Sequence, residues 1–222
     1  MKLAAMTNIY LFICACAGLI YGLTATYRRK QPLYFRLMIF PIACQVFLRA
    51  FYIVTLLCYG ELPDGFNIGF LGFAAFFLFL YLPNVGVIDH LLDENGSGYK
   101  KYRLLSLILP AAELALAVFT VLYDSFSLDV RISLAALLLL AALAGYFNLK
   151  HLIMPDVEGG IVRALRSFNG LCIALELLTL AEVWLFCSSY RSPAIVAVQA
   201  VLGVLYVIFL PLLNKETKKW IQ

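Results

Sequence analysis

The sequence has few charged residues. Asp, Glu, Lys and Arg make up 14% of the 222 residues, against about a quarter in soluble domains, whereas hydrophobic residues make up 64%. A soluble fold needs polar residues to cover its surface, so this composition excludes a water-soluble enzyme, a nucleic-acid-binding domain and a disordered chain. An integral membrane protein is the class that remains.

Catalytic and metal-binding motifs are also scarce. The chain has two histidines, and it contains no HExxH zinc helix, no GxSxG nucleophile elbow and no phosphate-binding glycine loop. His90, Asp93 and His151 could form a metal site, but histidines and carboxylates at span ends are more often solvated, and we favour that interpretation. We therefore predict no enzymatic activity, no metal and no cofactor.

Long apolar runs are what the sequence has in abundance. Seven runs reach the length of about 20 residues that a helix needs to cross a bilayer. They cover residues 8–26, 33–59, 66–88, 102–123, 130–149, 161–187 and 193–213. The breaks between them carry Pro, Gly or charged residues and are too short for a soluble domain. The sequence predicts an all-α, polytopic membrane helical bundle with seven transmembrane helices, forming a single domain over 1–222.

Basic residues are distributed unevenly between the two sides of this bundle. Thirteen Lys and Arg residues lie in the first, third and fifth loops and the C-terminal tail, and three lie on the opposite side. Cytoplasmic loops carry an excess of Lys and Arg. We therefore predict a multi-pass protein of the plasma or inner membrane, with its N-terminus outside and its C-terminus in the cytoplasm.

The seven spans also suggest an internal duplication. Small residues four apart occur in the first and fifth spans, at Gly18/Gly22 and Ala141/Gly145, and such pairs let helices pack closely. Pro83 and Pro211 lie near the ends of the third and seventh spans. A 3+1+3 parallel repeat would explain this placement, against the alternative that all membrane helices look alike. That layout resembles the sugar carriers with two triple-helix bundles, although their Pro-Gln signature is absent.

Ionisable residues inside the spans are the main functional candidates, because a charge in a bilayer is costly. Arg49 lies 13 residues after Arg36 in the second span, and Glu176 lies 13 residues after Arg163 in the sixth. Both spans run in the same direction, so we expect the guanidinium and the carboxylate at similar depth. At that depth they can form paired hydrogen bonds.

Polar residues continue along the helix faces that carry Arg49 and Glu176. Helical spacing places Gln45 and Tyr52 with Arg49, and it places Asn169, Cys172 and Thr179 with Glu176. One interpretation is a ligand site formed by Arg49, Glu176, Gln45, Tyr52, Asn169 and Thr179 in a polar cavity between the second and sixth helices. The other is a structural ion pair that holds these two helices together.

Four further residues carry separate predictions. Glu113 in the fourth span is a candidate proton-binding group, or a neutral hydrogen-bond donor to a neighbouring helix. Glu182 lies near the outer rim of the sixth span and is interpreted as a surface carboxylate. Cys58 and Cys187 end the second and sixth spans and could form a disulfide there, against the alternative of two free thiols.

Three functions are consistent with these features. The first hypothesis is a carrier that binds a small polar solute and transports it through the polar cavity. The second is a membrane sensor or receptor-like domain that signals through a separate cytoplasmic or membrane protein partner. The third is a structural or accessory subunit, in a complex or as a homo-oligomer. All three have the lipid bilayer as a partner, and none involves nucleic acid.

Overall fold

The computed structural model describes residues 2–28, 30–63, 67–88, 99–123, 126–155, 161–188 and 193–221. Every regular element within them is helical, and seven helices are long and apolar enough to cross a membrane. The elements are α1 (Lys2–Arg28), α2 (Leu33–Leu37), α3 (Ile39–Tyr59), α4 (Ile68–Pro83), the π-helical turn η1 (Asn84–Ile88), α5 (Lys100–Leu105), α6 (Ile108–Tyr123), α7 (Leu128–Ile153), α8 (Ile161–Ser188) and α9 (Pro193–Ile221).

The predicted spans agree with these helices, which confirms the all-helical fold class. The second, third and fourth spans each consist of two consecutive pieces, because α2 passes into α3, α4 into η1 and α5 into α6. The largest differences lie at the chain ends. The first helix begins at Lys2 rather than at residue 8, and the last continues to Ile221 rather than ending at 213.

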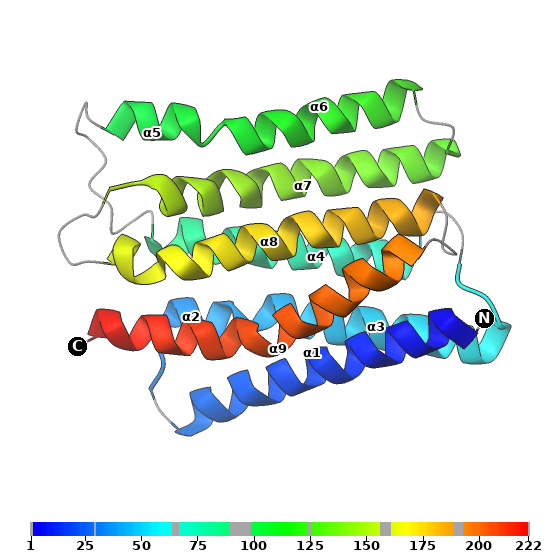
Figure 1. The fold of residues 1–222 in the computed structure, drawn as a ribbon, viewed down its shortest axis with the longest axis horizontal. Coiled ribbons are helices and arrows are strands. Elements are labelled where there is room, and N and C mark those ends of the chain that lie inside the picture. The colour runs from blue at the N-terminus through cyan, green and yellow to red at the C-terminus, as the bar shows by residue number, and fades with distance from the viewer. Residues whose placement is uncertain are drawn as a thin grey trace.

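Six of the spanning helices form a ring within the part of the chain that the structure describes. Around it, α1 packs on α3, α3 on α4, α4 on α7, α7 on α8, α8 on α9, and α9 returns to α1. The long α6 lies outside this ring and packs mainly on α7 (Figure 1). The N-terminus and the C-terminus lie at opposite ends of the bundle, here called the N-terminal and C-terminal ends.

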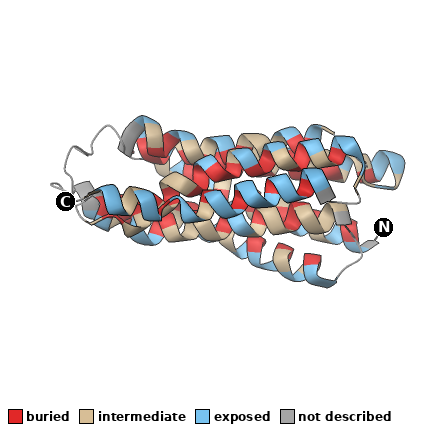
Figure 2. Cartoon of the chain, turned by 90° about the horizontal axis from the view of Figure 1, so that it is seen from above, coloured by how far each residue is buried: buried red, intermediate tan, exposed pale blue. Residues whose placement is uncertain are grey.

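The side chains divide between a buried interior and an apolar exterior. Buried residues face the inside of the bundle along its length, as Figure 2 shows. Large apolar residues such as Phe47 and Leu57 are 74% and 81% exposed on the outside. Contiguous exposed apolar surface of this kind is typical of a protein that contacts lipid. The helix lengths and this surface are compatible with an integral membrane protein.

The seam that closes the ring depends on two glycines. A methyl group at Gly18 of α1 would overlap the backbone carbonyl of Tyr206 on α9, and one at Gly203 of α9 would overlap the ring of Tyr10. The Tyr10 hydroxyl donates to the carbonyl of Ala200, at 3.0 Å. The small residues therefore allow α1 and α9 to approach closely, as the Gly18/Gly22 spacing indicates.

The ring has the order expected if two triple-helix units flank an extra span. The first unit would be α1, α3 and α4, the second α7, α8 and α9, and α6 is the span left outside. The duplication itself stays a prediction.

Candidate functional site

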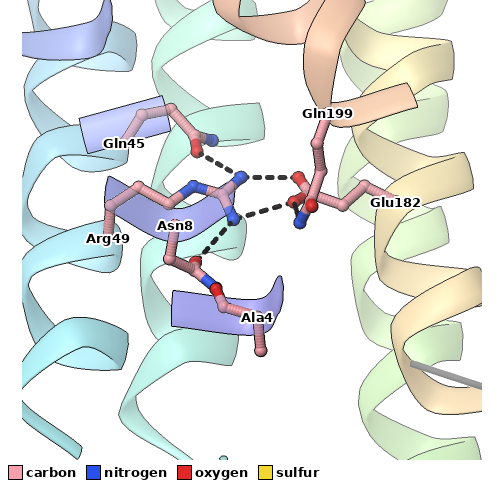
Figure 3. Close-up of polar contacts among 6 residues, drawn as sticks. All are labelled: Ala4, Asn8, Gln45, Arg49, Glu182 and Gln199. Atoms are coloured by element: carbon pink, nitrogen blue, oxygen red, sulfur yellow. Dashed lines mark hydrogen bonds and ion pairs between the residues drawn. The ribbon is translucent and has the colours of Figure 1, made fainter. Parts of the chain in front are cut away.

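Arg49 forms a buried ion pair with Glu182. Its Nη1 donates to Glu182 Oε1 at 2.8 Å and its Nη2 donates to Glu182 Oε2 at 2.5 Å (Figure 3). Both residues are 1% exposed. This two-pronged geometry is the strongest arrangement that a guanidinium and a carboxylate can make, and it joins α3 to α8.

Three amides surround this ion pair, each from a different helix. Asn8 of α1 and Gln45 of α3 accept from the guanidinium through their side-chain oxygens, both at 3.4 Å, and Gln199 of α9 donates to Glu182 Oε1 at 2.8 Å. The ring of Phe73 on α4 lies 5.8 Å from the guanidinium carbon. The arginine cluster, defined as Asn8, Gln45, Arg49, Glu182 and Gln199, therefore brings together α1, α3, α8 and α9.

Two sequence predictions are wrong at this cluster. Arg49 pairs with Glu182 and not with Glu176, and Glu182 is a buried partner rather than a surface carboxylate. The two acids are six positions apart, or about 9 Å along α8, and an arginine side chain is long enough to reach the more distant one. Glu182 is covered because Asn8 of α1 and Gln199 of α9 lie over the ion pair, each with a hydrogen bond to it.

The remaining residues of the predicted ligand site are buried but dispersed. Tyr52 stacks on Phe186 of α8, with ring centroids 5.5 Å apart. Thr179 lies beside the hydroxyl of Tyr206 on α9. Neither polar atom of the Asn169 side chain has a hydrogen-bond partner within the described ranges. Of the predicted set, only Gln45 contacts the Arg49 guanidinium directly.

Glu176 instead faces the carboxyl group of Glu113. The two groups interact directly although they come from α8 and α6, on either side of α7. A methyl group at Gly145 of α7 would lie 2.8 Å from Glu176 Oε1 and 3.1 Å from Glu113 Oε2, so both oxygens lie against the same bare stretch of backbone. Glycine at this position leaves the space in which the carboxyl pair, Glu113 and Glu176, meets.

The carboxyl pair has unsatisfied oxygens. Glu113 is 4% exposed and Glu176 is 0% exposed. Both oxygens of Glu113 and Oε1 of Glu176 lack a hydrogen-bond donor within the part of the chain that the structure describes. Buried polar atoms are normally paired, so these three oxygens need an explanation.

A chain of amides leads from Glu176 toward the C-terminal end of the bundle. Asn148 of α7 donates to Glu176 Oε2 at 3.3 Å, Asn84 of η1 donates to Asn148 Oδ1 at 2.8 Å, and Tyr34 of α2 donates to Asn84 Oδ1 at 3.1 Å. The amide chain, defined as Asn148, Asn84 and Tyr34, is buried throughout. It fixes the orientation of Glu176, whose other oxygen is left for Glu113.

The π-helical turn positions Asn84 for this role. The backbone N–H of Asn84 bonds to Tyr81, and its side-chain amide donates to the Leu80 carbonyl at 3.2 Å, the acceptor that the backbone N–H would have in an α-helix. Pro83 just before it has no N–H to continue the ladder. π-Helical turns often occur at functional sites.

Sequence analysis missed the amide chain. The available signals were the Pro83-Asn84 pair at the end of the third span and Asn148 near the end of the fifth. An uncharged amide within a span is not costly enough to be singled out as a functional candidate. Hydrogen bonds between helices far apart in the sequence cannot be predicted from residue spacing within one helix.

A groove lies in the angle between α6 and α8, along α7. Its volume is about 550 Å³. Among the described residues that line it, Glu113 is the only charged one. The apolar lining residues are Leu109, Ala112, Leu116, Leu134, Leu137, Leu138, Leu177, Leu180, Ala181, Val183, Trp184 and Leu185.

Two further predictions concern cysteine and metal. Cys58 is exposed and Cys187 is half-buried, and no disulfide joins them in the structure. His90 and Asp93 lie outside the described residues, and His151 is buried in α7.

Comparison with known proteins finds no match among family models, curated proteins or solved structures. The fold defines the class of the chain as a multi-pass bundle compatible with a membrane, and its chemistry has to be argued from its own residues.

Proposed function

We propose that this chain is a membrane carrier that exchanges a small polar cation for a proton at the carboxyl pair. The observation that supports this proposal is the contact of Glu113 with Glu176, both buried, with three oxygens lacking a donor. The predicted site at Arg49 is less suited to this task, since its guanidinium and Glu182 already neutralise one another.

The carboxyl pair needs a positive species between its oxygens. Two carboxylates in contact and away from water repel one another and lose their hydration. No salt bridge joins either group to a basic side chain within the described residues. A proton held between the two oxygens removes one charge and forms a hydrogen bond, and a bound cation can replace that proton.

Exchange follows from this competition. When a cation binds, the shared proton leaves for water, and the cation takes its place between the two carboxylates. When the cation leaves, a proton returns. The amide chain holds Glu176 in place during both steps, because Asn148 is bonded to Asn84 and Asn84 to Tyr34.

The arginine cluster has a structural role in this proposal. It joins four helices of the ring near its N-terminal end, and none of its five residues lines the groove. A rigid frame there leaves α6, outside the ring, as the element best placed to respond when the site changes its occupant.

The test uses the purified full chain in proteoliposomes with radiolabelled tetramethylammonium, choline and guanidinium. We choose cations that stay charged at all accessible pH values, so that none crosses the bilayer as a neutral base. With an acidic interior, we expect uptake of at least one of them and proton release measured by a trapped dye. Glu113→Gln and Glu176→Gln should abolish both signals. Glu216→Gln is the matched control, because Glu216 pairs with Lys219 near the C-terminus.

Three results would overturn the proposal. The first is that none of the three cations is taken up and none causes proton release from the vesicles. The second is that uptake persists unchanged in both carboxyl variants. The third, binding and proton release without uptake, would exclude a carrier and favour the receptor-like alternative.

A further inference from the structure

The groove beside the carboxyl pair has the shape and chemistry to accept the apolar part of a ligand. It follows α7 between α6 and α8, and Glu113 is the charged residue in its wall. We infer that the cation of this carrier is amphiphilic: its ammonium group binds the carboxyl pair and its hydrocarbon part occupies the groove. This inference rests on the proposed function and specifies its substrate class.

The lining restricts the kind of ligand. Leucines from three helices form its walls, including Leu109 and Leu116 of α6, Leu138 of α7 and Leu177 of α8, and Trp184 also lines it. No basic residue lines the groove within the described structure. A fatty acid or another amphiphilic anion would place its charge beside Glu113 and be repelled, whereas an alkylammonium ion brings the charge that the pair lacks.

The size of the groove suits a single hydrocarbon chain or a small ring system. Ligand pockets typically measure about 300–1,000 Å³, and this one measures about 550 Å³. Apart from Glu113, its described lining residues are all apolar, so the hydrocarbon part contributes to affinity and Glu113 determines the position of the charge.

The position of α6 gives the ligand a lateral route. Since α6 packs mainly on α7, α6 and α8 flank the groove without closing it by extensive contact. The side of α6 away from α7 exposes apolar residues such as Leu114 and Val118. An amphiphilic cation can therefore enter from the lipid with its chain in the groove and its head group reaching the carboxyl pair.

The experiment measures the affinity of the full chain in nanodiscs for tetramethylammonium, decyltrimethylammonium and decyl sulfate. Affinities are calculated from free aqueous ligand concentrations, and ligand taken up by the lipid is subtracted with empty nanodiscs. We expect decyltrimethylammonium to bind at least tenfold more tightly than tetramethylammonium, and decyl sulfate not to bind the site. Ala112→Trp fills the groove and should remove the tenfold gain while tetramethylammonium still binds. Ala181→Trp fills it from α8 and serves if the first variant does not fold.

The matched control is Ala111→Trp, which adds the same side chain to the exposed neighbour of Ala112 outside the groove. It should bind both cations like the unchanged chain. Three results would overturn the inference without affecting the proposed carrier. They are equal affinity for the two cations, a tenfold gain for decyltrimethylammonium that persists in the groove-filled variants, and binding of decyl sulfate. Absence of binding for both cations would overturn the inference, and the uptake of choline and guanidinium then decides whether the proposed function stands.

Discussion

Arg49 and Glu182 stabilise the bundle through their mutual neutralisation. Each is the only ionic partner of the other within the described residues, and both are buried. Removing one partner leaves the other as an uncompensated charge inside the bundle. Arg49→Gln should therefore lower the free energy of unfolding by about 3–5 kcal/mol, measured by denaturant titration of the purified protein in detergent.

The double variant Arg49→Gln/Glu182→Gln distinguishes the cost of an unpaired buried charge from the loss of the contact between the two side chains. It removes both charges together, so we expect it to recover much of the stability lost by the single change. Asn8→Ala should have a small effect, because its contact with the guanidinium is long, at 3.4 Å. If Arg49→Gln alone were as stable as the unchanged chain, the structural role of the pair would be wrong.

Gly145 is the residue that decides whether the two carboxyl groups can meet. A methyl group there would lie 2.8 Å from Glu176 Oε1, 3.0 Å from Leu109 Cδ2 and 3.1 Å from Glu113 Oε2, which are all far ends of flexible side chains. Gly145→Ala should thus displace the carboxyls without unfolding the bundle. We expect cation binding about fivefold weaker, the equivalent of one hydrogen bond of about 1 kcal/mol.

The measurement for Gly145→Ala is equilibrium binding of the cation that passes the uptake test, beside a thermal melting curve. Gly170→Ala on α8 is the control, because a methyl group there has only Leu152 nearby, at 3.8 Å. Equal binding in both variants would show that Gly145 does not shape the site.

At the scale of helices, the seam between α1 and α9 closes the ring. Gly18 faces backbone, not a flexible side chain, so a larger residue has to push the two helices apart. Gly18→Ala should lower stability by about 1–3 kcal/mol, the usual effect of overpacking. The check is a thermal melt beside Gly86→Ala, where a methyl group meets no atom of the described residues within 4 Å. Equal melting of the two variants would contradict the role assigned to this seam.

The spans could be predicted because each depends on a local property, a run of apolar residues long enough to cross a bilayer. The partner of Arg49 could not be predicted by the same reasoning. Counting residues along a span gives the depth of a backbone atom. Which carboxylate pairs with Arg49 depends instead on the reach of the arginine side chain and on how far α1 extends over the arginine cluster. Glu176 was correctly singled out as buried, but its neighbour Glu113 is on a helix that sequence gives no reason to place there.

At the scale of the whole molecule, the distribution of basic residues predicts which way the bundle faces. Cys58 is exposed near the end of α3, at the N-terminal end of the bundle. With the N-terminus outside, a membrane-impermeant maleimide should label Cys58 in intact cells, and Cys58→Ser should lose that label. A tag on the C-terminus should be cut by protease only after the membrane is permeabilised. The reverse pattern would invert the predicted topology.

The ion pair also bears on how the chain is made. Glu182 follows Arg49 by 133 residues, so Arg49 is synthesised well before its partner exists. In the predicted membrane topology, we expect a nascent chain that stops after α7 to carry an unpaired guanidinium, which α8 pairs when it is added. Since α9 must then reach back to α1 to complete the ring, the last two helices are the point at which a cell's quality control can distinguish a finished molecule from an abandoned one.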